Sequence, residues 1–169
     1  MKRALRHWLL GLALALAAGA SAAVLPPDWR LLGQGEMRWF GFRLYAASLW
    51  APDGRWQPEQ PYALELRYAR DIPARRLVEA SIEEMQRLGA ADPERLARWK
   101  VELERVFPDV RSGDVIVGLH QPGSGAEFYH QGRLTGRVDD AGFARSFFAI
   151  WLDPRTREPG LRASLLGLS

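Results

Sequence analysis

The sequence predicts an α+β domain in which helices cover one side of an antiparallel sheet. Two stretches of alternating apolar and polar residues, before residue 71 and after residue 113, indicate strands. Between them, and again near the C-terminus, apolar residues recur at helical spacing. The order is therefore strands, two helices, strands and two helices, with no internal repeat or long linker that would divide the chain into two domains.

The first strands are expected to form a hairpin over residues 29–50, with turn glycines at Gly33, Gly35 and Gly41. On its second strand, alternation separates Phe42, Leu44, Ala46, Ser48 and Trp50 from Arg43, Tyr45, Ala47 and Leu49. A Pro-Asp-Gly turn at residues 52–54 ends this strand. The next strand, over residues 62–70, places Leu64, Leu66 and Tyr68 opposite Glu65 and Arg67.

Helical periodicity predicts two helices after these strands. The first spans residues 73–88, with Pro73 at its first position, and its apolar stripe comprises Leu77, Val78, Ser81, Ile82, Met85 and Leu88. Asp92 is the expected N-cap of the second helix, because a proline and a glutamate follow it. That helix runs to about Val106, and its stripe comprises Leu96, Trp99, Leu103 and Val106.

Three short strands are expected next, over residues 114–121, 126–130 and 134–138, because glycine-containing turn sequences separate them. Asp139 or Asp140 is expected to cap a helix that runs to Trp151. A last helix spans residues 159–166 and is ended by Gly167 in a left-handed conformation. This closing helix pair should pack on the sheet through Phe147, Ile150, Trp151, Leu161 and Leu165.

The N-terminus has the features of a secretory signal peptide. Basic residues precede an uncharged apolar run over residues 8–18, which is short for a membrane span, and Ala20-Ser21-Ala22 is a typical cleavage sequence. We therefore expect residues 1–22 to direct export to a bacterial periplasm and to be removed near Ala22. Residues 23–169 then form a single domain without stable insertion in a membrane.

Charge argues against nucleic acid as a partner. Residues 1–22 hold three of the 23 Lys and Arg side chains and none of the 20 Asp and Glu side chains, so the formal net charge of +3 falls to zero after cleavage. A neutral domain has no overall field that attracts a polyanion. The sequence leaves the oligomeric state open.

Neither a cofactor nor a metal ion is expected. The chain has no cysteine, and His120 and His130 lack the spacing of a metal-ligand set. Gly33-Gln34-Gly35 lacks the third glycine and the following helix of a dinucleotide-binding loop, and residues 123–125 are typical of a turn.

Arginines on the predicted strands are the main indication of a ligand site. Arg38, Arg43, Arg67 and Arg70 are interleaved with aromatic residues, namely Trp39, Phe40, Tyr45 and Tyr68. Arginine can bind a carboxylate through two hydrogen bonds, and an aromatic wall can bury the apolar part of such a ligand. The alternative is that these arginines lie on the solvent face or pair with Glu36 and Glu65.

Four segments, in the same order along the chain, resemble the chalcone isomerase-like family. They are GQGEMRWFGFRLYAASLW, similar to the family's opening hairpin; LRYARDIPARRL, similar to its strand-to-helix step; SGDVIVGLHQPGSGAEFYHQGRLTG, similar to its later hairpin; and FFAIWLDPRTREPGLRASLLG, similar to its C-terminal helices. The resemblance covers about residues 31–167. It implies an open-faced β-sandwich fold, in which a ligand cleft lies between an antiparallel sheet and a helical layer.

The resembled family contains plant enzymes that cyclise a chalcone and relatives that bind fatty acids in the same cleft. The enzymes combine an arginine on the opening hairpin with tyrosine, asparagine and threonine donors, which stabilise an oxyanion. This sequence has no asparagine and only two threonines, Thr135 and Thr156, and it has Tyr45 where the enzymes carry threonine. Only Arg38 matches, so we expect no chalcone isomerase activity.

The leading interpretation is a non-catalytic protein that binds a small amphiphile, such as a fatty acid or a similar carboxylate, in the cleft. The candidate ligand-binding residues are Arg38, Tyr45, Arg67 and Tyr68, with Arg38 holding the carboxylate. One alternative is an isomerase or intramolecular lyase that acts on an enone or phenolic substrate, with Arg38 as its catalytic residue. Another is a periplasmic interaction module whose cleft is filled by its own side chains.

Overall fold

A computed structural model of the chain describes residues 24–89 and 92–168. The predicted signal peptide, residues 1–22, lies outside the described residues. In chain order the elements are β1 (Trp29–Trp39), β2 (Phe42–Pro52), β3 (Tyr62–Tyr68), α1 (Ala74–Arg87), α2 (Pro93–Val106), β4 (Val115–Gln121), β5 (Gly125–His130), β6 (Arg133–Val138), α3 (Ala141–Leu152) and α4 (Pro159–Leu166).

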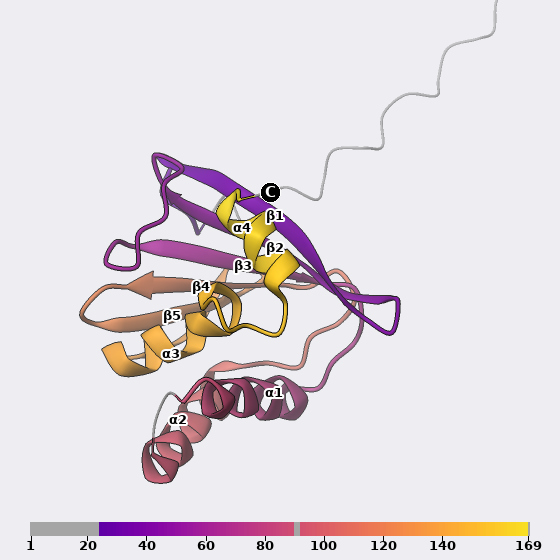
Figure 1. Cartoon of the computed structure of the whole chain (residues 1–169). Helices are drawn as coiled ribbons and strands as arrows, with labels where there is room; N and C mark the ends of the chain where they lie inside the picture. The colour runs from indigo at the N-terminus through magenta and orange to yellow at the C-terminus, as the bar shows by residue number, and fades with distance from the viewer. Residues whose placement is uncertain (1–23, 90–91, 169) are drawn as a thin grey trace, which may run out of the picture.

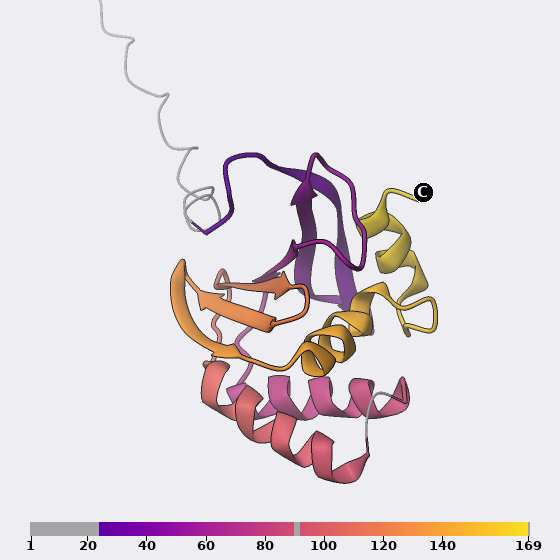
Figure 2. The ribbon, with the colours of Figure 1, turned by 90° about the vertical axis from the view of Figure 1, so that its left-hand side faces the viewer.

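The strands form one antiparallel sheet whose order follows the chain, β1-β2-β3-β4-β5-β6. Helices α1 and α2 lie between β3 and β4 in sequence, and α3 and α4 follow β6. Figures 1 and 2 show a strongly curved sheet with the helices on one side of it. The predicted α+β class, with an antiparallel sheet under a helical layer, is confirmed.

Each face of the sheet carries its own apolar cluster. The helix-facing side holds the main core, in which Phe128, Phe143 and Phe148 are fully buried. The opposite side, called the outer face below, holds a smaller cluster made of Trp29, Ala63, Val115, Val117 and Leu119. The predicted alternation along β2 and β3 is confirmed, because Ala47, Leu49, Leu64, Leu66 and Tyr68 lie in the main core, whereas Trp50 packs against the smaller cluster.

The predicted helices are present, with small differences at their ends. All four residues of the α2 stripe are buried, and Asp92 accepts a hydrogen bond from the backbone N–H of Arg95 at 2.8 Å. Pro73 precedes α1 as its N-cap instead of starting it, because its backbone is extended. Asp140, and not Asp139, caps α3 by accepting from the backbone N–H of Phe143 at 3.0 Å.

The last helix, α4, lies directly against β1, and two glycines allow this approach. A Cβ atom at Gly33 would lie 2.1 Å from the carbonyl oxygen of Ser164 and 2.5 Å from that of Leu165. A Cβ atom at Gly35 would lie 2.8 Å from a methyl group of Leu161. The expectation that Gly33 and Gly35 are turn residues is therefore wrong. They lie within β1 and give α4 room to bury Leu161 and Leu165.

No helix within residues 24–89 and 92–168 is long and apolar enough to cross a membrane. The same residues contain no group of three or more His, Asp or Glu side chains that could hold a metal ion.

Candidate functional site

Two tyrosines, which we call the tyrosine pair, lie side by side on the helix-facing side of the sheet. Tyr45 of β2 is directly opposite Tyr68 of β3, and their rings meet edge to face with centroids 5.9 Å apart. Trp151 of α3 donates a hydrogen bond from Nε1 to the Tyr45 hydroxyl at 3.0 Å. Met37 of β1, opposite Tyr45, adds an apolar wall. Two hydroxyl groups are thus held in apolar surroundings.

Both hydroxyls of the tyrosine pair can donate hydrogen bonds. Burial raises the pKa of Tyr45 to about 12, although the hydrogen bond from Trp151 opposes this, and burial also raises the pKa of Tyr68. Both groups therefore keep their protons at neutral pH. The Tyr45 hydroxyl accepts from Trp151, so its own proton is available to a further acceptor. The Tyr68 hydroxyl has no hydrogen-bond partner among the described residues.

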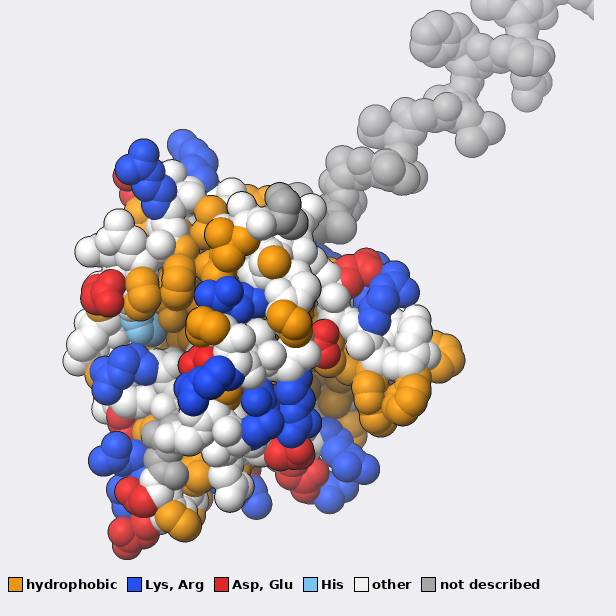
Figure 3. Space-filling model, viewed as in Figure 1, with side chains coloured by type: hydrophobic (Ala, Val, Ile, Leu, Met, Phe, Trp, Pro, Cys, Tyr) orange, Lys and Arg blue, Asp and Glu red, His pale blue; other side chains and the backbone are white. Residues whose placement is uncertain are grey.

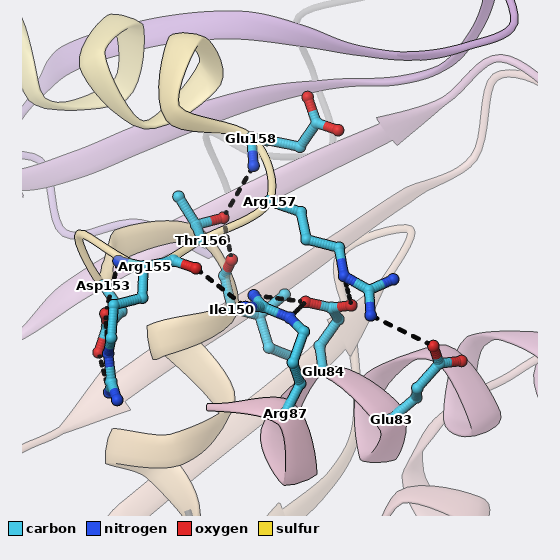
Figure 4. A network of polar contacts seen from close by, with 9 residues as sticks. All are labelled: Glu83, Glu84, Arg87, Ile150, Asp153, Arg155, Thr156, Arg157 and Glu158. Carbon is cyan, nitrogen blue, oxygen red and sulfur yellow. Dashed lines mark hydrogen bonds and ion pairs between the residues drawn. The ribbon is translucent and has the colours of Figure 1, made fainter. Parts of the chain in front are cut away.

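A charged network joins α1 to the loop between α3 and α4 (Figure 4). Glu84 of α1 binds Arg87 at 2.9 Å and Arg157 of the loop at 3.0 Å. After burial, the negative charges of Glu158 and Glu84 also contribute to the raised pKa of Tyr45. Arg157 lies in the loop that follows α3, the helix whose Trp151 binds the Tyr45 hydroxyl.

The loop that carries Arg157 is shaped by Thr156, whose side chain is buried. Its hydroxyl donates to the carbonyl oxygen of Ile150 at 2.8 Å and accepts from the backbone N–H of Glu158 at 3.2 Å. The other threonine, Thr135, donates to a carbonyl oxygen of β5 at 3.1 Å. Both threonine hydroxyls thus bind the backbone, and neither belongs to the tyrosine pair.

Arg38, the predicted carboxylate ligand, lies near the end of the β1–β2 hairpin and is bound to Glu36. Its Nη2 is 2.7 Å from one oxygen of Glu36, and Arg43 binds the other oxygen at 2.9 Å. Glu36 is opposite Ala46, and Ala46 is opposite Arg67 on the outer face. The Arg38 side chain is 58% exposed and engaged with a carboxylate of the outer face, so it is not brought together with Tyr45.

Arg67 also lies apart from the tyrosine pair, on the outer face of β3. Its Nη2 is 3.7 Å from Glu65, whose side chain is buried. The second oxygen of Glu65 has no hydrogen-bond partner among the described residues. Of the four predicted ligand-binding residues, the structure brings together only Tyr45 and Tyr68. The contacts of the arginines agree with the alternative interpretation, in which they pair with Glu36 and Glu65.

Two hollows of the described surface lie away from the tyrosine pair. The larger, about 460 Å³, lies between β3, β4 and α3, and its lining includes Tyr62, His120 and Arg145. Tyr62 and His120 stack with ring centroids 4.5 Å apart. Burial lowers the pKa of His120, so its ring is neutral at pH 7. The smaller hollow, about 280 Å³, lies where β5 and β6 approach Gln121. Neither contains a ligand-binding residue predicted from the sequence.

Sequence reasoning missed two features of this region. Trp151 was predicted as a core residue, and its hydrogen bond to Tyr45 was not foreseen, because 106 residues separate the two. Arg157 was not singled out either. The adjacent acids Glu83 and Glu84 on α1 were the available signal, since Arg157 reaches both, at 3.5 and 3.0 Å.

Comparisons with known proteins agree with this architecture. The model of the family described as chalcone isomerase-like matches residues 21–167. An uncharacterized protein of Haemophilus influenzae is 28% identical over 140 residues, which cover 82% of this chain and 68% of that protein. A crystal structure of an Arabidopsis thaliana fatty-acid binding protein aligns with a TM-score of 0.65, 16% identity, and coverage of 85% of this chain and 89% of the other. At that identity the likeness establishes the fold alone.

Proposed function

Because this chain belongs to the chalcone isomerase-like family, we propose that it binds a small amphiphile and does not catalyse a reaction. The observation that carries the proposal is the tyrosine pair, which holds two hydroxyl donors within the apolar core. In this proposal the polar head of the ligand, a carboxylate or a similar acceptor, binds Tyr45 and Tyr68. Its apolar part packs against Met37 and Trp151.

Two further observations support binding over catalysis. The Arabidopsis relative of the same fold is described as a fatty-acid binding protein. The donors expected of a chalcone isomerase are missing, since the chain has no asparagine and both threonine hydroxyls bind the backbone. Without the asparagine and threonine donors, a cyclising enzyme of this kind loses part of the stabilisation of its oxyanion.

A negatively charged carboxylate head is bound more tightly when a cation pairs with it. We propose Arg157, in place of Arg38, as that cation. Arg157 is bound to Glu84 and lies in the loop that follows α3, whose Trp151 binds the Tyr45 hydroxyl. Its side chain is 56% exposed, so it can turn from Glu84 to a ligand without leaving water. Arg38, held by Glu36 at the outer face, has no such connection to the tyrosine pair.

Calorimetric titration of the chain with long-chain fatty acids and with the matching fatty alcohols tests this proposal. The Tyr68→Phe variant removes the unpartnered hydroxyl and keeps the ring. A hydrogen bond to a charged group contributes about 1.5–3 kcal/mol, so the variant should bind fatty acids roughly 10- to 150-fold more weakly. Tyr129→Phe is the matched control, because its hydroxyl binds Glu127 at 2.6 Å, away from the pair.

Arg157→Ala should weaken binding of the acid more than binding of the alcohol, because only the acid is charged. Two results would overturn the proposal. One is the absence of binding by any fatty acid or alcohol of the series. The other is equal affinity of the wild type and Tyr68→Phe.

We also propose that the protein acts in the periplasm after losing residues 1–22. The support is the basic start, the short apolar run and the cleavage sequence of this segment. N-terminal sequencing of the protein recovered from a periplasmic extract should begin at about Ala23. Recovery of the uncleaved chain from the cytoplasm alone would contradict this location.

A further inference from the structure

The end of the β1–β2 hairpin carries three large aromatic side chains that the fold does not bury. Trp39 is 63% exposed, Phe40 83% and Phe42 60%. We call these residues the aromatic tip. In Figure 3 the hydrophobic side chains at this end of the molecule stand clear of the body, at the place where Figure 1 shows the hairpin projecting beyond the other strands. Exposed apolar groups on this scale mark interaction sites in soluble proteins.

The backbone conformation of the aromatic tip is unfavourable for a phenylalanine at position 40. Phe40 and Gly41 form the turn, with φ angles of +48° and +80°. Such turns favour asparagine, aspartate or glycine at the first position, and a bulky side chain there is unfavourable. Phe40 gains no compensating burial in the folded chain. Phe40 thus opposes the residue preference of this turn and does not stabilise the fold in return. Such a residue indicates a function other than folding.

The charges beside the aromatic tip are mainly positive. Arg38 and Arg43 flank it and share one acid, Glu36. The guanidinium of Arg70 stacks over the Phe42 ring, 4.7 Å from its centroid. Arg70 is followed by Asp71, but that carboxylate turns away and accepts a hydrogen bond from the backbone N–H of Ser112 at 2.9 Å. Three arginines thus stand behind the aromatic rings against one nearby glutamate.

We propose that the aromatic tip docks the protein on the surface of a lipid bilayer that contains anionic lipids. Aromatic rings reside at the boundary between head groups and acyl chains, and arginines behind them meet the negative head groups. This is peripheral docking and does not require a membrane-spanning segment. It is independent of the ligand proposed above, since it depends on different side chains.

A lipid surface fits the aromatic tip better than a protein partner does. The three rings, exposed to the fractions given above, offer about 300–500 Å² of contact area. A stable protein interface buries roughly 800 Å² on each partner. The tip is also the convex end of a two-residue turn, which can enter a soft head-group layer but presents no extended face to a folded partner.

The test compares the full chain with a variant that carries Trp39→Ser, Phe40→Asn and Phe42→Ser. Asparagine suits the turn conformation at position 40, so the hairpin of the variant should keep its fold. Val101→Ser on α2 is the control, because Val101 is 61% exposed and lies on another element. Each protein is sedimented with phosphatidylcholine vesicles, with and without phosphatidylglycerol, at low and high salt.

The wild type and Val101→Ser should bind phosphatidylglycerol vesicles, more weakly at high salt, and the triple variant should bind at least tenfold more weakly. Residues 1–22 are identical in all three chains and could bind vesicles themselves, so oxidative footprinting locates the contact. Vesicles should protect Trp39, Phe40 and Phe42 but not the peptide that contains Val101. The proposal is overturned if vesicles leave the tip unprotected, or if the triple substitution abolishes self-association seen without vesicles.

Discussion

The contact between α4 and β1 can be tested by adding one methyl group at Gly33. A Cβ atom there would lie 2.1 Å from the carbonyl oxygen of Ser164, whereas real Cβ contacts essentially never fall below 3.0 Å. The obstacle is backbone on both sides, so no side-chain rotation relieves it. Gly33→Ala must therefore displace the last turn of α4. Overpacking of this kind costs about 1–3 kcal/mol.

If α4 undocks completely, the loss is larger. Leu161 and Leu165, exposed by only 6% and 0%, would then return to water, at about 1.5–3 kcal/mol each. We therefore expect Gly33→Ala to lower the free energy of unfolding by about 2–5 kcal/mol, between the overpacking cost and the full loss of the two leucines. Urea unfolding followed by circular dichroism measures this change.

Gly160→Ala, in the first turn of α4, is the matched control. A Cβ atom at Gly160 has no neighbour within 4 Å, and alanine favours the helix, so this variant should be more stable by about 0.5–1 kcal/mol. A Gly33→Ala variant that stays within about 0.5 kcal/mol of the wild type, the usual range of a neutral substitution, would refute the close packing of α4 on β1.

Two further substitutions test polar groups that contact the core. Burial lowers the pKa of His120 below its ordinary value, so between that lowered pKa and about 6.5 the unfolded chain binds a proton that the folded chain does not. The free energy of unfolding should therefore fall as the pH drops below about 6.5, and His120 accounts for at most about 1.4 kcal/mol per pH unit of this fall. The His120→Phe variant keeps a ring against Tyr62 and should lack this contribution. Equal pH slopes in both proteins would contradict the lowered pKa of His120. Asp140→Ala removes the cap of α3 and the acceptor of the Trp99 indole N–H, at 2.8 Å, so it should cost about 2–4 kcal/mol in urea unfolding. Asp139→Ala, at an exposed position, is its control and should change stability little.

The fold was largely predictable because its elements have strong local patterns. The α2 stripe repeats at helical spacing and is buried as predicted, and the β2 residues alternate between two faces that bury different clusters. Close approaches between elements were not predictable in the same way. Nothing near Gly33 in the sequence indicates that α4, more than 120 residues later, will lie against it.

The candidate site was predictable only in part, and alternation explains both the success and the failure. Tyr45 and Tyr68 share a face because each follows the apolar positions of its strand, but their direct opposition depends on the β2–β3 register. Arg67 precedes Tyr68, so alternation alone places it on the other face. For Arg38 the pattern fails, because the β1–β2 register shifts between Met37 and Arg38 and alternation no longer determines which face the next residue takes.

The β1–β2 hairpin connects the proposed ligand site with the proposed bilayer contact and also keeps the two separable. Phe42 of the aromatic tip and Tyr45 of the tyrosine pair lie three residues apart on β2, about 10 Å along a strand. A bilayer that holds the tip would therefore lie close to the tyrosine pair, and an amphiphile would have a short path between them. The tip contributes no hydroxyl to the ligand and the pair contributes no exposed ring to the bilayer. Changes at the tip should therefore alter how fast a ligand is exchanged with vesicles, while changes at Tyr68 alter how tightly it is held.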